Sequence, residues 1–200
     1  ESIRRIRREF SKQLAEASAE EVVRIALNLA RRSEIQYRFF AYELVHHHGQ
    51  ALRSLRTRSL EELGKGIESW STVDCFACYL AGPAWRENQV PDTLIKRWTR
   101  SKDHWWRRAA LVSTVPLNSK ARGGKGDVRR TLEICELLVD DREDMVVKAL
   151  SWALRELAKR NPESVYDFLA RYEGKLASRV SREVKNKLHT GLKNARRAKA

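Results

Sequence analysis

Apolar residues recur every three to four positions along almost the whole chain. This period places apolar side chains on one face of an α-helix. It predicts helices over residues 2–16, 20–32, 34–48, 59–66, 71–82, 91–100, 104–115, 127–139, 144–159, 162–173 and 180–192. The sequence Ser18-x-x-Glu21 is a capping box that supports the start of the second helix. No segment shows convincing strand alternation, so the pattern predicts an all-α fold.

Short polar or Gly/Pro segments separate the predicted helices. They include "GPAWRENQVPD" at 82–92, "NP" at 161–162 and "PLNSKARGGKGD" at 116–127. Glycine and proline interrupt helices, so each of these segments is predicted to be a joint. The segment 116–127 is the longest irregular one, and we expect a flexible basic loop whose Lys125 contacts phosphate.

Four segments of the chain align on a charged residue that is followed by small and apolar ones. They are "YRFFAYEL" with Arg38, "VDCFACYL" with Asp74, "RRAALVST" with Arg108 and "VKALSWAL" with Lys148. The intervals from 38 to 74, 74 to 108 and 108 to 148 are 36, 34 and 40 residues, close to the ~40-residue period of HEAT-type repeats. We therefore predict a single domain over residues 1–200, with a basic tail at 193–200. Its expected architecture is a curved HEAT-like solenoid whose second helices line a basic concave groove.

The charge balance points to a polyanionic partner. Lys and Arg number 40 against 26 Asp and Glu, which gives a net charge of +14 and a pI near 10.1. Such an excess favours nucleic acid first and an anionic membrane surface second. No run approaches the ~20 apolar residues of a membrane-spanning helix, and no secretory signal pattern is visible. The chain begins at Glu1 rather than Met, so a removed targeting segment stays open.

The aligned charges suit a groove that holds DNA, with one exception. Arg38, Arg108 and Lys148 place cations at the aligned position, as a phosphate backbone requires. Asp74 places a carboxylate there, which opposes nonspecific DNA binding and needs another explanation. The cations are therefore candidate DNA contacts, together with Arg107.

Two tryptophans accompany the aligned charges at helical spacing. Trp70 lies four residues before Asp74 and Trp152 lies four residues after Lys148, so each pair shares a helix face. Aromatic faces stabilise cations, and a carboxylate stabilises a developing positive charge. Cleavage of a glycosidic bond passes through a cationic sugar, which is the species such a site would favour. The ordinary alternative is that the tryptophans are core residues and that the acid caps a helix. The residues alone leave both interpretations open.

Other chemical motifs are weaker. Cys75 and Cys78 form a C-x-x-C and His46, His47 and His48 run together, but zinc sites usually need two such pairs. We expect the cysteines to be packing residues, with neither metal nor cofactor bound. Three cysteines, an odd number, favour a reducing compartment. The "GGKG" at 123–126 lacks the spacing of a nucleotide-binding loop.

Several segments resemble the AlkD-like DNA alkylation repair glycosylases. They are "YRFFAYELV" at 37–45, "SWSTVD" at 69–74, "DHWWRRAALV" at 103–112 and "KALSWALRELAKRNPESVYDFL" at 148–169. The last contains the most specific motif, whereas Trp-x-x-x-Asp alone would be weak. The resemblance extends from about Ile3 to Lys193. It implies a HEAT-like protein that removes N3- and N7-alkylated purines from DNA.

The resemblance also implies roles for individual residues. The family's functional positions fall on Trp70, Asp74, Arg108 and Trp152, and all four are present. The two tryptophans would lie against the deoxyribose, Asp74 would stabilise the sugar cation and position water, and Arg108 would hold a nearby phosphate. Base-excising enzymes commonly flip their target, whereas the AlkD-like proteins leave it stacked. The chain departs from the family in a missing or shortened first helix and in the 116–127 segment, which bear on substrate range.

We therefore expect a monomeric base-excision repair enzyme acting on duplex DNA that contains alkylated purines. The expected catalytic residues are Asp74, Trp70 and Trp152, and the expected DNA contacts are Arg108, Arg38, Lys148, Arg107 and Lys125. We expect an intracellular protein, in bacteria cytoplasmic and nucleoid-associated, with no membrane partner. One alternative is a non-catalytic HEAT-like protein that recognises bent, branched or damaged DNA. Another is a scaffold for an acidic protein.

Overall fold

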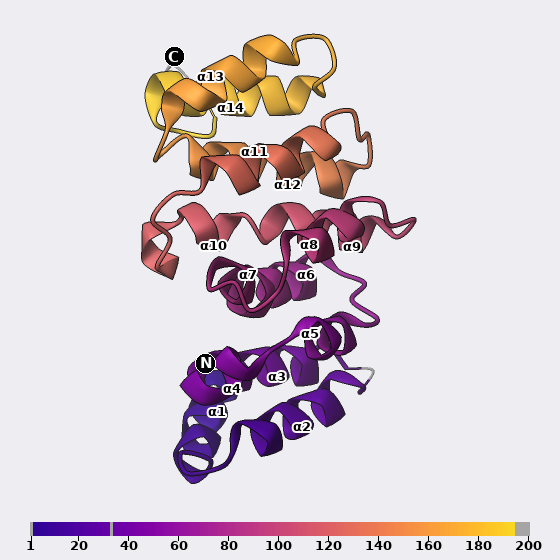
Figure 1. Ribbon diagram of the computed structural model, residues 1–200, viewed down its shortest axis with the longest axis vertical. Coiled ribbons are helices and arrows are strands. Elements are labelled where there is room, and N and C mark those ends of the chain that lie inside the picture. The colour runs from indigo at the N-terminus through magenta and orange to yellow at the C-terminus, as the bar shows by residue number, and fades with distance from the viewer. Residues whose placement is uncertain (1, 33, 195–200) are drawn as a thin grey trace. The chain divides into compact units, whose positions relative to one another are not determined.

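All regular secondary structure in the part of the chain that the structure describes is helical (Figure 1). The structure is a computed structural model that describes residues 2–32 and 34–194. The all-α prediction is therefore confirmed for these residues. Most of the predicted basic tail, residues 195–200, lies outside them. Contacts divide the chain into two compact units, Glu1–Leu94 and Ile95–Ala200, which are called unit 1 and unit 2.

Unit 1 is built from two layers of helices around a continuous apolar core. Its elements are α1 (Ser2–Gln13), α2 (Ala19–Ala30), α3 (Ile35–His47), α4 (Gly49–Ser54), α5 (Thr57–Gly64), α6 (Trp70–Phe76), the π-helix η1 (Ala77–Ala81) and α7 (Gly82–Arg86). Helix α2 packs against α3, α4 and α5, and α3 also contacts α1, α6 and η1. Tyr42, Phe76 and Trp85 are the largest side chains of this core.

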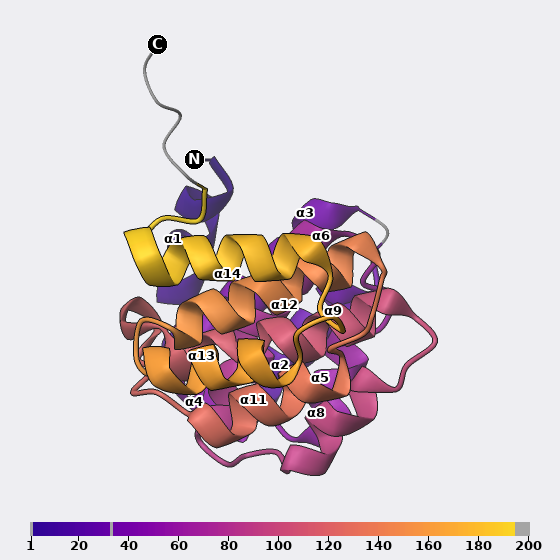
Figure 2. The ribbon, with the colours of Figure 1, turned by 90° about the horizontal axis from the view of Figure 1, so that it is seen from above.

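Unit 2 is organised around helix α12. Its elements are α8 (Asp92–Thr99), which begins at the end of unit 1, α9 (His104–Val112), α10 (Val115–Asn118), the 3-10 helix η2 (Lys120–Arg122), α11 (Val128–Leu137), α12 (Asp144–Leu157), α13 (Pro162–Arg171) and α14 (Ser178–Thr190). Helix α12 contacts α9, α10, α11, α13 and α14. Figure 2 shows α9, α12 and α14 on one side of the unit and α11 and α13 on the other.

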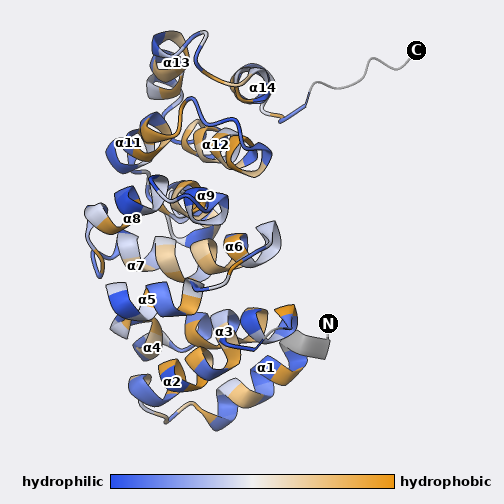
Figure 3. Cartoon of the chain, turned by 90° about the vertical axis from the view of Figure 1, so that its right-hand side faces the viewer, coloured by the Kyte–Doolittle hydropathy of each residue, from blue (hydrophilic) through white to orange (hydrophobic). Residues whose placement is uncertain are grey.

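Local sequence signals explain where many helices begin. Ser18 caps α2 through its hydroxyl, which accepts from the backbone N–H of Glu21 at 3.2 Å, as the capping box predicts. Five further helices start at a side chain that caps the first turn: His48, Ser69, Asp103, Asp127 and Asn161. The apolar periodicity of α2 gives it a buried side, and this helix packs against the largely hydrophobic α3 (Figure 3). The aligned charged residues all lie on second helices, namely α3, α6, α9 and α12.

The predicted joint at 82–92 is wrong in its first half. The chain stays helical from Trp70 to Arg86 because η1 and α7 continue α6 without a break. Pro83 stands in the first turn of α7, inside this continuous run, where proline lacks the N–H that would bond to the preceding turn. The π-helix closes with the N–H of Gly82 bonded to the carbonyl of Ala77. Helix α4, which begins at a glycine and is only six residues long, was not predicted.

The segment 116–127 is held in place rather than left as a flexible loop. It contains the end of α10 and all of η2. Arg160 donates from Nε to the carbonyl of Asn118 at 2.8 Å and from Nη2 to the carbonyl of Gly124 at 2.7 Å. The N–H of Gly126 donates to the carbonyl of Leu117 at 2.9 Å. Several backbone groups of the segment therefore have protein partners, and the predicted irregular, flexible loop is corrected to a short helical turn tied to Arg160.

A buried polar cluster joins α12 to α14. The hydroxyl of Ser151 donates to Glu183 Oε2 at 2.6 Å, and both residues are buried. Arg155 donates from Nε to Ser151 Oγ at 3.1 Å and lies 3.9 Å from Glu183. Lys193 approaches the second carboxylate oxygen at 3.5 Å. Arg155 is thus a contact between neighbouring helices, as its place in "WALRE" suggests.

Replacing Glu183 with glutamine is expected to lower the free energy of unfolding by about 2 kcal/mol. The change removes the charge that balances the half-buried Arg155 and weakens the charged hydrogen bond from Ser151. Urea titration followed by circular dichroism measures the loss. The control is Glu173→Gln, on an exposed acid of the same unit, which should change stability by less than ~0.5 kcal/mol. Equal effects of the two variants would show that the cluster does not stabilise unit 2.

Candidate functional site

Helix α6 presents Trp70 and Asp74 on its open face. The buried residues Thr72, Val73 and Phe76 hold the opposite face in the core of unit 1. Trp70 is 58% exposed, and Asp74, one turn later, is half-buried. Because residues i and i+4 of a helix are neighbours, the indole and the carboxylate lie on the same face.

The ordinary explanations for this pair do not hold. Aromatic side chains stabilise a fold mainly through burial, so an indole that is more than half exposed contributes little to the core. Asp74 does not cap the helix, because Ser69 does: its hydroxyl accepts from the N–H of Thr72 at 3.4 Å. An exposed aromatic one turn from an acid is suited to holding a cationic group.

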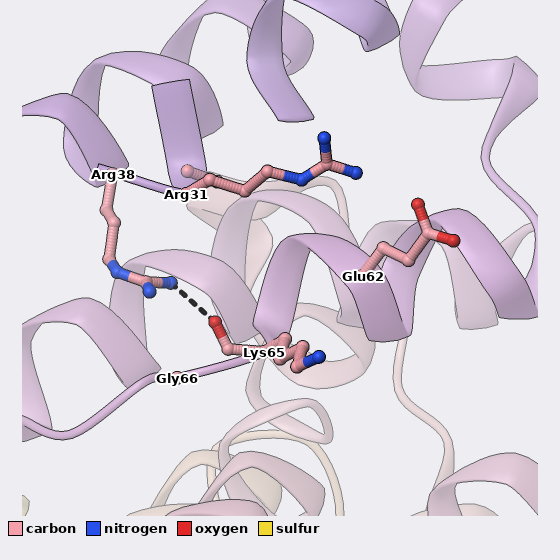
Figure 4. A pocket seen from close by; sticks show the side chains of 6 residues that line it. Arg31, Arg38, Glu62, Lys65 and Gly66 are labelled. Atoms are coloured by element: carbon pink, nitrogen blue, oxygen red, sulfur yellow. Dashed lines mark hydrogen bonds between the residues drawn. The ribbon is translucent and has the colours of Figure 1, made fainter. Parts of the chain in front are cut away.

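Arg38 lies on α3, the neighbour of α6 in unit 1. Its Nη1 donates to the carbonyl of Lys65 at 2.9 Å (Figure 4). The same side chain lies beside Tyr42, one turn later on α3. The Tyr42 hydroxyl in turn donates to the carbonyl of Leu63 at 2.9 Å. Burial raises the pKa of Tyr42 to about 12, although Arg38 acts in the opposite direction.

The raised pKa of Tyr42 predicts a loss of stability at alkaline pH. Below pH 10 the phenol is protonated in both folded and unfolded chains, so its contribution is complete. Between pH 10 and about 12 the unfolded chain loses the proton first, and the stability advantage over Tyr42→Phe should shrink by about 2–3 kcal/mol. Urea unfolding of both proteins at pH 9 and pH 11.5 measures this difference. An advantage that is the same at both pH values would contradict the prediction.

In unit 2, Arg107 and Arg108 are engaged with the protein itself. Arg108 is 5% exposed and donates from Nη1 to the carbonyl of Met145, in the first turn of α12, at 2.6 Å. Arg107 forms an ion pair with Asp141 at 2.7 Å and donates to the carbonyl of Ser101 at 2.9 Å. Both arginines therefore fix the connection between α9 and the start of α12. Their contact with phosphate stays a prediction.

Lys148 and Trp152 lie one turn apart on α12, as their spacing predicts. Lys148 pairs with Asp144 at 2.7 Å, and Asp144 also binds Arg179 at 2.8 Å. The hydrogen bond from Lys148, with the nearby Arg179, lowers the pKa of Asp144. Trp152 is half-buried, and Lys125 is exposed on the segment after η2.

The structure places the predicted residues of each unit on neighbouring elements, but it does not bring Lys125 to the others. The Gly124 carbonyl beside Lys125 is bound by Arg160, beyond the C-terminal end of α12, whereas Arg108 binds at the start of that helix. Unit 1 holds Trp70 and Asp74 on one face of α6, with Arg38 on the adjacent helix α3. Unit 2 holds a second group on α9, α12 and the 116–127 segment, namely Arg107, Arg108, Lys148, Trp152 and Lys125.

A comparison with known protein families shows to which family the chain belongs. A family model described as "DNA alkylation repair enzyme" matches residues 1–188. The chain belongs to this family. The resemblance found in the sequence is therefore confirmed.

Two solved structures share the helical-repeat fold of this DNA alkylation repair family member. One is described as a predicted DNA alkylation repair enzyme from Enterococcus faecalis, with 19% identity and a TM-score of 0.69 over 92% of this chain and 85% of that one. The other is smu.31 from Streptococcus mutans UA159, with 17% identity and a TM-score of 0.56 over 96% and 98% of the two chains. At these identities the likeness concerns the fold. A search of curated proteins found no match.

The cysteines of this family member are mostly buried, and one of its histidines caps a helix. Cys78 and Cys135 are buried and Cys75 is half-buried, and all three are thiols rather than disulfides. Burial raises the pKa of Cys135. His48 caps α4 by accepting from the N–H of Ala51 at 3.1 Å. Residues 2–32 and 34–194 contain no group of three His, Cys, Asp or Glu side chains that would hold a metal ion.

Among the described helices, none combines the length and apolar character that crossing a membrane requires.

Sequence reasoning missed the residues that surround Arg38. Arg31 ends α2, and Lys65 and Gly66 follow α5, so the three come together only when α2, α3 and α5 pack. The available signal was Lys65-Gly66 directly after a helical segment, since glycine with positive φ commonly follows a helix end.

Proposed function

We propose that this protein is a DNA glycosylase that hydrolyses the N-glycosidic bond of positively charged N3- or N7-alkylated purines in duplex DNA. The observation that carries the proposal is the pairing of a solvent-exposed Trp70 with Asp74 on the open face of α6. In a member of the DNA alkylation repair enzyme family, this pair has the chemical character that a cationic sugar requires.

The proposed reaction uses the charge that alkylation places on the base. The bond between C1′ and the purine nitrogen breaks, and its electron pair neutralises the purine, so no strong general acid is needed. The deoxyribose becomes an oxocarbenium-like cation, which the carboxylate of Asp74 and the indole face of Trp70 stabilise. Water then adds to C1′, and Asp74 orients the water and accepts its proton.

Unit 2 supplies further DNA contacts in this proposal. Trp152, on α12, would lie against the sugar backbone, and Lys148 and Lys125 would contact phosphates. Arg108 would hold the nearby phosphate, as the family resemblance implies, while its bond to the Met145 carbonyl positions the helix that carries Lys148 and Trp152. The enzyme would act as a monomer, in the compartment that contains the DNA.

The test is release of free base from duplex DNA that contains 7-methylguanine. We expect the wild-type protein to release the base and to leave an abasic site, which chromatography and alkaline strand cleavage detect separately. Binding without release would instead support the non-catalytic alternative, a HEAT-like protein that recognises bent, branched or damaged DNA. DNA affinity that is insensitive to salt would oppose both, because phosphate contacts release counterions.

A further inference from the structure

A basic cleft in unit 1 has no part in the chemistry proposed above. Its volume is about 510 Å³, and it opens where the ends of α2 and α5 meet the first turn of α3 (Figure 4). The residues that line it are Ala30, Arg31, Arg38, Glu62, Lys65 and Gly66.

The cleft carries an excess of positive charge that the fold does not neutralise. Three of its six lining residues are cations and one is a carboxylate. That carboxylate, Glu62, already binds Arg58 at 3.1 Å. Within residues 2–32 and 34–194, no carboxylate forms an ion pair with the side chain of Arg31 or Lys65, and both residues are exposed. Two cations on one cleft wall therefore repel each other unless an anion lies between them.

Arg38 is fixed before any ligand arrives. Its Nη1 donates to the Lys65 carbonyl at 2.9 Å, and its side chain lies beside Tyr42, one turn along α3. Gly66 leaves room for the guanidinium, because a Cβ at this residue would lie 2.9 Å from Arg38 Nη2. The φ of +76° at this position also favours glycine. A guanidinium held in this way loses little side-chain freedom when it binds an oxyanion.

The lining argues against an ordinary small-molecule site. Such sites have mostly apolar walls with a few polar groups, whereas Ala30 is the apolar side chain in this lining. The cleft is also larger than one phosphate needs, which leaves room for the sugars on either side. Arginine and lysine together suit an anion with several oxygens, since arginine binds two oxygens and lysine acts as a point charge.

We propose that this cleft binds a backbone phosphodiester of the DNA, with Arg31, Arg38 and Lys65 as its ligands and Gly66 as the residue that admits Arg38. The choice of DNA as the source of the phosphate rests on the proposed function. The cleft then anchors the DNA through unit 1 independently of the Trp70 and Asp74 chemistry.

The experiment compares the salt dependence of DNA binding by wild type and the double variant Arg31→Gln/Lys65→Gln. Fluorescence anisotropy with an undamaged duplex, titrated at several salt concentrations, gives the slope of log K against log salt. Loss of one phosphate contact should reduce the slope by about 1 and weaken binding roughly tenfold near physiological salt. The matched control is Arg24→Gln/Arg53→Gln, which removes the same charge from two exposed arginines of unit 1 outside the cleft lining and should leave the slope within ~0.3 of wild type.

The outcomes separate this inference from the glycosylase proposal. A reduced slope in the cleft variant alone supports the cleft, even if the wild type releases no 7-methylguanine and the glycosylase proposal fails. An unchanged slope, or the same reduction in the control, overturns the cleft, even if base release is normal. A third arm titrates inorganic phosphate alone and follows thermal stability. Saturation of wild type below ~1 mM phosphate, together with an unchanged DNA slope in the variant, would assign the cleft to free phosphate and overturn the proposal.

Discussion

Substitution of Asp74 by asparagine is expected to slow the release of 7-methylguanine by about 100-fold or more while duplex DNA binding is retained. Asparagine keeps the size and polarity of the side chain but lacks the negative charge that would stabilise the sugar cation. Loss of one preorganised electrostatic contact to a transition state typically costs 10²- to 10³-fold in rate, or about 3–4 kcal/mol. Single-turnover base release at saturating protein measures the chemical step apart from binding.

The control for this prediction is Glu68→Gln. Glu68 is an exposed acid two residues before Trp70, and its replacement changes the net charge of +14 by the same amount as Asp74→Asn. Both variants should bind an undamaged duplex at least as tightly as wild type, because each removes a charge that repels phosphate. Base release by Asp74→Asn at the wild-type rate would overturn the catalytic role of Asp74. A slow Glu68→Gln variant would attribute the effect to net charge.

Substitution of Gly124 by alanine is expected to lower the free energy of unfolding by about 3 kcal/mol. A Cβ at this residue would lie 2.5 Å from the carbonyl oxygen of Pro116 and 2.6 Å from the carbonyl carbon of Leu117. These are backbone atoms, so they move only if α10 shifts. The shift would also strain the two bonds by which Arg160 holds the Asn118 and Gly124 carbonyls. Urea unfolding measures the loss.

Gly49→Ala provides the matched comparison. There the new Cβ would meet Arg53 Nη1 at 3.2 Å, which is the end of a flexible side chain. Gly49 is also the first residue of α4, where alanine restricts the unfolded chain, so the change should be neutral or stabilising by up to ~1 kcal/mol. If Gly124→Ala is as stable as Gly49→Ala, the close approach of Gly124 to α10 is wrong.

Periodicity predicted most of the helices because most of them bury apolar residues on one side. It failed at Gly49–Ser54, since a six-residue helix has too few turns to display a period. It also failed at Gly82-Pro83, where the usual helix-breaking pair lies inside a continuous helical run. Arg160, more than thirty residues beyond the 116–127 segment, could not be assigned to that segment from local sequence.

The candidate site was predictable only in part. The spacing of Trp70 and Asp74 gave their shared helix face, and the resemblance added Arg108 and Trp152. The engagement of Arg108 with the Met145 carbonyl depends on how α9 packs against α12, which spacing does not contain. The basic cleft around Arg38 likewise comes from three helix ends that meet only in the folded chain.

The π-helix after Asp74 sets the angle, about one helical axis, between the face that carries Asp74 and the face that buries Trp85. Asp74 and Tyr79, both half-buried, are five residues apart, and the π-helix adds one residue to the run between them. Tyr79 contacts His46, whose ring stacks on it and whose Nδ1 lies 3.1 Å from the Tyr79 carbonyl. Deletion of one residue within Ala77–Ala81 would restore regular α-helical bonding but rotate α6 by about 100° relative to the buried Trp85. With the longer spacing, one helical run carries Asp74 on the open face of α6 and buries Trp85.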